Sequence, residues 1–113
     1  MDSPFHQGDI VWLSIDPVLG HEQAGRRPVL IVWNDDLLQR IPGLAAVCPI
    51  TTTDNGFPMH VPVAVSDGTV HGFVQCEHTR TLDLAARGAT YAGHMAEEPL
   101  QKILAILRGC FAS

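Results

Sequence analysis

Short apolar segments separated by turn-forming residues run along most of this chain, and they constrain its fold more than any other feature. Residues 8–16, 28–33 and 44–51 are rich in β-branched and aliphatic side chains, and turn-forming residues bound them. Such runs predict β-strands, the last two of them buried. Pro28 agrees with this prediction, because the first position of a strand needs no ladder donor.

The second half of the chain continues the same pattern. In residues 59–65, apolar side chains alternate with His60, Pro62 and Ala64. This alternation predicts a half-buried strand, and Pro62 places it at a sheet edge. The other predicted elements are one helical turn within residues 34–43, an Asn-Gly turn within 52–58, one bent strand or two short ones over 73–83, and a last strand within 84–95.

Residues 97–109 form the one segment with a convincing helical pattern. Pro99 suits the first helical position and Gly109 can cap the end. The helix has an apolar face, which either packs on the core or contacts a second copy of the chain. That face consists of Leu100, Ile103, Leu104 and Leu107. Many short strands and one closing helix predict a mainly β fold with a C-terminal helix (α+β), a small, strongly bent antiparallel sheet or barrel.

Length and composition restrict the domain count and the class of protein. The 113 residues, 46% apolar and 17% charged, suffice for one domain, residues 1–113, with one core. The three cysteines, Cys48, Cys76 and Cys110, are an odd number without close pairs, which argues against a disulfide framework and a zinc site. No membrane-length apolar run or signal-peptide pattern is present, so we expect a cytoplasmic protein without metal or cofactor.

The formal net charge is −5. An acidic chain fits badly with a protein that binds nucleic acid through its overall field, since such proteins usually carry a basic face. Any RNA or DNA site on this chain therefore has to rest on a local group of cations.

Arg27 and Thr51 stand at the ends of two predicted strands. If residues 28–33 and 44–50 pair as antiparallel neighbours, the numbers of opposite residues add up to the same value along the ladder. This register places Arg27 close to Thr51. We therefore expect both side chains at one end of the sheet, with the loop of residues 17–27 overhanging them.

An arginine next to a hydroxyl suits a phosphate group. The guanidinium is a planar, permanently charged fork of donors that matches two phosphate oxygens. When a ribose 2′-hydroxyl attacks the adjacent phosphorus, negative charge builds on the non-bridging oxygens, and donors fixed there favour the transition state. The alternative is that Arg27 forms an ion pair with Glu22 or Asp16 and only pins the loop.

The loop before the second predicted strand carries a specific motif. The segment GHEQAGRRP contains Gly-x-Glu-Gln-x-Gly-x-Arg-Pro without gaps, between a Gly-Asp strand and an aliphatic strand. This arrangement resembles the opening of the MazF/PemK family of toxin endoribonucleases. CPITTTDNGFP (48–58) resembles the family's Pro-x-Thr-Thr segment, and CEHTRTLDLAARG (76–88) resembles its acidic-Gln-x-Arg-x-hydrophobic segment. The similarity covers roughly residues 8–108.

The resemblance implies an SH3-like antiparallel barrel of the CcdB/MazF type and a homodimer. It implies metal-independent cleavage of single-stranded RNA at a short sequence, leaving a 2′,3′-cyclic phosphate and a 5′-hydroxyl. It also implies a MazE-like antitoxin partner whose C-terminal segment occupies the RNA groove.

The resemblance assigns roles by motif position. Arg27 and Thr51 take the places of the catalytic arginine and threonine. The expected RNA-binding residues are Glu22, Gln23, Arg26, Thr52, Glu77, His78 and Arg80. The family commonly has glutamine where this chain has His78. Because histidine can donate to a base or stack on it, this departure affects the recognised sequence first; a role for His78 as general acid is a second interpretation.

Two other functions remain open on this fold, because a fold does not fix a function. One is a non-catalytic toxin of the CcdB type, which binds DNA gyrase and cuts nothing. The other is an inactive homologue that only binds antitoxin. Cleavage needs Arg27 together with Thr51, whereas binding to gyrase does not.

Overall fold

The computed structural model describes residues 3–14, 25–54, 56–65 and 68–112. Its strands are β1 (Asp9–Ser14), β2 (Arg26–Ile31), β3 (Leu44–Thr51), β4 (His60–Ala64), β5 (His71–Gln75), β6 (Arg80–Asp83) and β7 (Thr90–His94). The helices are α1 (Asp35–Arg40), the short 3-10 helix η1 (Cys76–His78) and α2 (Glu97–Phe111). Within the described ranges, no helix is both long and apolar enough to cross a membrane.

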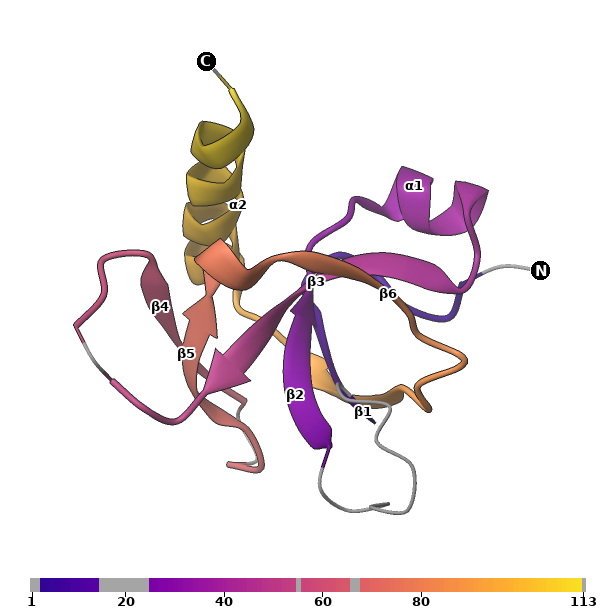
Figure 1. Cartoon of the computed structure of the whole chain (residues 1–113), viewed down its shortest axis with the longest axis horizontal. Helices are drawn as coiled ribbons and strands as arrows, with labels where there is room; N and C mark the ends of the chain where they lie inside the picture. The colour runs from indigo at the N-terminus through magenta and orange to yellow at the C-terminus, as the bar shows by residue number, and fades with distance from the viewer. Residues whose placement is uncertain (1–2, 15–24, 55, 66–67, 113) are drawn as a thin grey trace.

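The strands form one curved, antiparallel sheet around β3. The order is β4-β5-β3-β2-β1-β7, and β6 also pairs with β3. One edge of β3 pairs with β2, while its other edge pairs first with β6 and then, at Ile50 and Thr51, with β5. The sheet curls into a half-barrel, with α2 beside β4 and β5 and α1 on the opposite side of the molecule (Figure 1). The predicted fold class is confirmed.

Both faces of the central strands are buried, which explains their continuous apolar runs. Leu30 and Cys48 belong to one core cluster, and Val29 and Val47 belong to another on the opposite face. α2 covers the first cluster with Leu100, Ile103 and Leu107, whereas α1 contributes Leu38 to the second. The sequence of a strand buried on both faces is a run of aliphatic residues, without alternation between apolar and polar side chains.

The edge-strand prediction for residues 59–65 is confirmed, with one exception. β4 lies at the end of the strand order, and Pro62 and Ala64 are exposed. His60 differs from them, because only 4% of its side chain is exposed. Residues 73–83 fold as two short strands, β5 and β6, with η1 between them.

β2 begins earlier than predicted, so Pro28 is its third residue and not its first. The strand is longer because Arg26 and Arg27 pair with the end of β1. The backbone N–H of Val32 donates to the carbonyl of Ala46 on β3. Backbone nitrogens of every second residue face the same neighbouring strand, so the nitrogen of Pro28 faces β3 as well. The ladder with β3 starts only at Val29, and the missing N–H therefore breaks no ladder bond.

α2 is also longer than predicted. It runs from Glu97 to Phe111, so Gly109 lies inside it and Pro99 is its third residue. Pro99 is tolerated there because the first turn of a helix has free N–H groups in any case. The helix ends at Phe111, and the N–H of the C-cap residue Ala112 donates to the carbonyl of Arg108.

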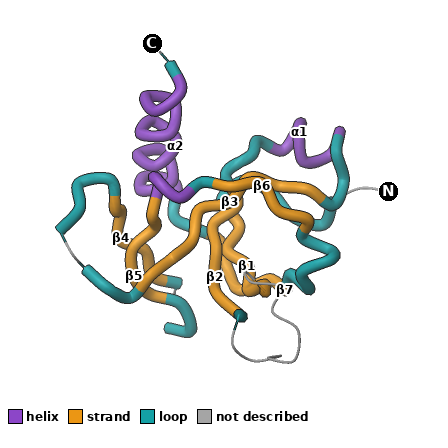
Figure 2. Tube along the Cα trace, viewed as in Figure 1, coloured by secondary structure: helices purple, strands orange, loops and turns teal. Residues whose placement is uncertain are grey.

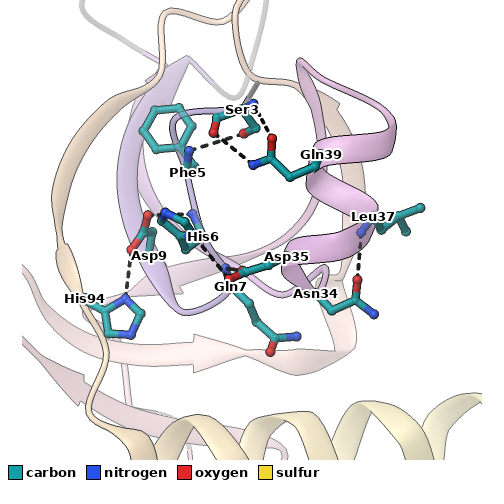
Figure 3. A network of polar contacts seen from close by, with 10 residues as sticks. All are labelled: Ser3, Phe5, His6, Gln7, Asp9, Asn34, Asp35, Leu37, Gln39 and His94. Atoms are coloured by element: carbon teal, nitrogen blue, oxygen red, sulfur yellow. Dashed lines mark hydrogen bonds and ion pairs between the residues drawn. The ribbon is translucent and has the colours of Figure 1, made fainter. Parts of the chain in front are cut away.

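Polar contacts tie the N-terminal segment to α1 and β7 (Figure 3). The backbone N–H of Gln7 donates to Asp35 Oδ1 at 2.7 Å, and this bond lowers the pKa of Asp35. Asp9 is buried; its carboxylate accepts the backbone N–H of His6 and lies 2.8 Å from His94 Nδ1. These contacts fix the start of β1, and Arg27 lies at the other end of the ladder, opposite Leu13.

Candidate active site

A cavity opens where β3 parts from β2. The two strands pair as far as Val29 and Pro49, and beyond this point β3 turns toward β5 (Figure 2). The cavity between the start of β2 and the end of β3 has a volume of about 470 Å³. It is lined by Trp12, Arg26, Arg27, Pro28, Ile50, Thr51, Thr52, Thr69, Val70 and His71.

The predicted meeting of Arg27 and Thr51 at one end of the sheet is confirmed. The observed pairs, such as Leu30 with Cys48, extend in register to Arg27 against Thr51. The two residues are not a ladder pair, because the strands have already separated. They line the same cavity from opposite strands, which leaves room for a ligand between them.

Arg27 presents its charge without an acidic partner among the described residues. Its side chain is exposed, and within the described ranges its guanidinium makes one hydrogen bond, from Nη1 to the carbonyl of Arg26 at 3.0 Å. The remaining N–H groups of the fork are available to a phosphate. The alternative ion pairs of Arg27, with Glu22 or Asp16, lie outside the described residues, as does Gln23.

Arg26 is held differently from its neighbour. Its guanidinium donates to the carbonyl of Gly88 at 2.9 Å, to Thr90 Oγ1 at 3.1 Å and to the carbonyl of Trp12 at 3.4 Å. These bonds tie Arg26 to β1 and β7. Its positive charge still borders the cavity, but most of its donors are already used.

The hydroxyl of Thr51 donates to no other group in the described part of the chain. Its Oγ1 accepts the backbone N–H of Thr53 at 3.2 Å, which occupies an oxygen lone pair and leaves the O–H to seek another acceptor. Thr52 follows on the rim of the same cavity and is exposed.

Gly72 on β5 keeps Thr51 in position. Its φ of +146° lies in a region that favours glycine, and a Cβ at this position would overlap the carbonyl oxygen of Thr51. The close approach of the two backbones, where β5 meets the end of β3, therefore requires the absence of a side chain.

A second cavity, of about 240 Å³, lies further along β2 and β3. It is lined by Val29, Val47, Pro49, Gln75, His78, Arg80 and Leu82. Side chains alternate along a strand, so Arg27 and Val29 project from the same face of β2. The second cavity thus lies on the face of β2 from which Arg27 projects, and it combines an apolar floor with polar residues.

Glu77 lies in η1, one residue before His78. Burial raises the pKa of Glu77, but hydrogen bonds from His60 and from its own backbone outweigh burial, and the net pKa is lowered. Its Oε2 lies 2.7 Å from His60 Nε2 and 3.6 Å from His78 Nε2. Glu77 is therefore an ionised hydrogen-bond acceptor near the second cavity.

Three of the seven arginine and lysine residues, Arg26, Arg27 and Arg80, line these two cavities despite the acidic total. Arg26, Arg27 and His71 line the first cavity, and His78 and Arg80 line the second. Among the described residues that line them, none is acidic. The combination of a guanidinium, hydroxyl donors and adjacent apolar surface can bind a phosphodiester together with its neighbouring bases.

Sequence reasoning missed three residues of this region. Thr69 lines the first cavity from the turn before β5, His71 lines it from the first residue of β5, and His60 supports Glu77 from β4. None of them belongs to a recognisable motif, because the curvature of the sheet brings these segments to β2 and β3. Because His60 alternates with Val61 and Val63, the sequence pattern predicts that it faces outward. The pattern does not predict that Glu77 covers the His60 side chain.

Comparisons with known proteins agree with this geometry. The family model described as a PemK-like, MazF-like toxin of type II toxin–antitoxin systems matches residues 6–111. The endoribonuclease toxin ChpB of Escherichia coli K12 is 39% identical to this chain over an alignment of 108 residues. The match covers 90% of this chain and 90% of ChpB.

Solved structures show the same fold. The crystal structure of MazF from Deinococcus radiodurans superposes with a TM-score of 0.80 at 31% identity, covering 96% of this chain and 97% of the other. MazF from the same organism in its MazE–MazF crystal structure gives a TM-score of 0.77 at 26% identity, covering 96% and 95%. With the family model spanning nearly the whole chain, this protein belongs to the PemK-like, MazF-like toxin family of type II toxin–antitoxin systems.

Proposed function

We propose that this protein is an endoribonuclease toxin that cleaves single-stranded RNA at a specific sequence without a metal ion. The observation that carries the proposal is the placement of Arg27 and Thr51 on opposite strands around one cavity. Membership of the toxin family and the endoribonuclease activity that the name of the relative ChpB records support it.

In the proposed reaction the ribose 2′-oxygen attacks the adjacent phosphorus. The 2′-hydroxyl loses its proton as its P–O bond forms, the bond to the 5′-oxygen breaks, and the 5′-oxygen takes up one proton and leaves as a hydroxyl, so the reaction has no net change in protons. Arg27 stabilises the negative charge that develops on the non-bridging oxygens and takes part in proton transfer, and Thr51 donates its O–H to one of those oxygens. The products are a 2′,3′-cyclic phosphate and a 5′-hydroxyl.

The neighbouring residues bind the RNA on either side of the cleaved bond. Arg26, Thr52 and Arg80 supply phosphate contacts, while Glu77 and His78 contact bases near the second cavity. Glu22 and Gln23, which lie outside the described residues, are further RNA-binding residues by their position in the family motif. Because the cationic region is small, random RNA should bind weakly. Contacts between these cations and phosphates release counterions, so the affinity should also fall as the salt concentration rises.

Long unstructured RNA incubated with purified protein in EDTA tests the proposal. Discrete fragments that carry 5′-hydroxyl ends are expected, and Arg27→Ala should abolish them. Intact RNA after incubation with folded, antitoxin-free protein would contradict the proposal. In that case inhibition of gyrase by the same preparation would support the CcdB type of action, and binding to antitoxin alone would indicate an inactive homologue.

We also propose a homodimer and a MazE-like antitoxin as partners, in the cytoplasm where mRNA is found. An exposed groove between α2, α1 and β6 supports the dimer, since Leu104, Leu107 and Phe111 line it and 81% of Phe111 is exposed. Phe111→Glu should convert the dimer to a monomer in light scattering. The antitoxin proposal rests on the MazE–MazF complex of the Deinococcus relative; an acidic antitoxin segment would complement the cavity cations.

A further inference from the structure

His60 on β4 is buried beneath the carboxylate of Glu77. Only 4% of its side chain is exposed, compared with 25% for Glu77, and His60 Nε2 lies 2.7 Å from Glu77 Oε2. Because an ionised carboxylate can only accept, His60 must donate its Nε2–H to Glu77. This contact joins the edge strand to η1, which borders the second cavity.

The other ring nitrogen of His60 has no partner among the described residues. Nδ1 is fully buried, and the ring of Phe57 meets the imidazole edge-on with 5.2 Å between the ring centroids. A buried polar atom without a hydrogen bond destabilises a fold, and an apolar side chain of similar size would avoid this loss. The histidine therefore gives no packing advantage here, and its distinctive contribution is the donor that it offers to Glu77.

The histidine contacts use one oxygen of the Glu77 carboxylate, and the other oxygen has lone pairs to accept a further hydrogen bond. Both histidine contacts of Glu77, with His60 and with His78, go to Oε2. Within the described part of the chain, Oε1 has no side-chain partner. A carboxylate held at one oxygen by a buried donor presents the other oxygen in a defined direction.

Other histidine–carboxylate pairs in the structure lack this arrangement. In the pair of His6 with Asp35 both side chains are mostly exposed, at 61% and 58%. In the pair of His94 with Asp9 the histidine is the exposed member. Among the described pairs, His60 with Glu77 is thus the one in which a buried histidine supports a carboxylate next to the RNA-binding residues.

We propose that His60 is a positioning residue for base recognition: it fixes the Glu77 carboxylate through Oε2 so that Oε1 accepts a hydrogen bond from the exocyclic amino group of an RNA base. The inference rests on the proposed function and concerns its sequence preference. Adenine, cytosine and guanine carry such an amino group. Uracil carries carbonyl oxygens on both sides of its N–H, and these oxygens repel a carboxylate.

Cleavage of a randomised RNA followed by sequencing of the fragment ends tests the role of His60. His60→Leu fills the space without a donor, and it should weaken the preference for an amino-bearing base at one position by about tenfold or more. His60→Gln retains an N–H donor and should restore part of the preference. A purely structural role would instead slow the cleavage of all sequences alike, and that result would overturn the inference.

Two further variants show whether His60 acts through Glu77. In a Glu77→Ala background, where the base preference is already lost, His60→Leu should cause no further loss. His6→Gln removes the matched histidine in the exposed pair with Asp35 and should leave the preference unchanged. If His60→Leu weakens the preference equally with and without Glu77, the inference is wrong.

Binding of short 2′-O-methyl oligonucleotides separates this inference from the proposed chemistry, since their blocked 2′-oxygen cannot attack. A protein that binds amino-bearing bases selectively through Glu77 and His60 but never cleaves RNA would contradict only the chemistry. A protein that cleaves RNA while His60→Leu keeps the wild-type preference would contradict only this inference. Absence of any RNA binding would contradict both.

Discussion

The carbonyl oxygen of Thr51 lies so close to the α-carbon of Gly72 that a methyl group at position 72 would overlap it. Gly72→Ala should therefore displace the end of β3 and lower the cleavage rate, in addition to straining a backbone at φ +146°. Gly43→Ala is the matched control, since Gly43 has a φ of +96° but open space around its Cβ position. Both variants should lose stability, by roughly 1–2 kcal/mol for backbone strain alone, but only Gly72→Ala should lose activity beyond its loss of folded protein.

Arg26 and Arg27 should separate stability from activity. Arg26→Ala removes hydrogen bonds to Gly88, Thr90 and Trp12 and should lower the free energy of unfolding by about 1–3 kcal/mol, with a moderate loss of RNA affinity. Arg27→Ala should leave the unfolding curve unchanged and abolish cleavage. Arg27→Lys should restore little, because an ammonium cannot reproduce the planar fork. Equal effects of the two alanine variants on stability would argue against this assignment.

The thiols should react in two classes. Burial raises the pKa of Cys48 to about 11 and that of Cys76 to about 12, whereas Cys110 is exposed. Because the thiolate is the reactive form, a thiol-reactive dye at neutral pH should label native protein at Cys110 alone. In denaturant all three cysteines should react. Rapid labelling of Cys48 in native protein would show that the core around β3 opens readily.

Glu77 should make stability depend on pH in the acidic range. Its pKa in the folded protein lies below the usual 4.5. Burial raises this pKa, but the hydrogen bond from His60, together with the other contacts of Glu77, lowers it by more. A lowered folded-state pKa means that the carboxylate stabilises the fold above its unfolded-state pKa, and that this contribution is lost as the pH falls through the folded-state value. The difference in unfolding free energy between wild type and Glu77→Gln should therefore shrink below pH 4.5. A difference that stays constant across this range would be incompatible with the His60 contact.

The sequence predicted the strands well because both faces of β1, β2 and β3 are buried, and this burial produces long apolar runs. Element ends were harder to predict. β2 begins at Arg26 because β1 continues far enough to pair with it, a contact between distant segments. α2 continues past Gly109 because glycine only weakens a helix and does not end it.

The site was predictable only where a strand register or a family motif reached it. The pairing of residues 28–33 with 44–50 brings Arg27 to Thr51, so this meeting followed from two strands alone. The cavity itself depends on the turn of β3 from β2 toward β5, which no local pattern encodes. The same holds for Gly72 and His60, whose roles depend on where β5 and η1 lie.

Arg27 and Thr51 should act together on one phosphate, and a double-mutant cycle in single-turnover RNA cleavage measures this directly. Thr51→Ala should slow cleavage by about 100-fold to 1,000-fold, as expected for loss of a transition-state donor. Arg27→Ala should slow it at least as much, and the double variant should be about as slow as Arg27→Ala alone, because residues that act as a unit are strongly non-additive. A wild-type rate for Thr51→Ala, or two effects that multiply in full, would contradict a shared site.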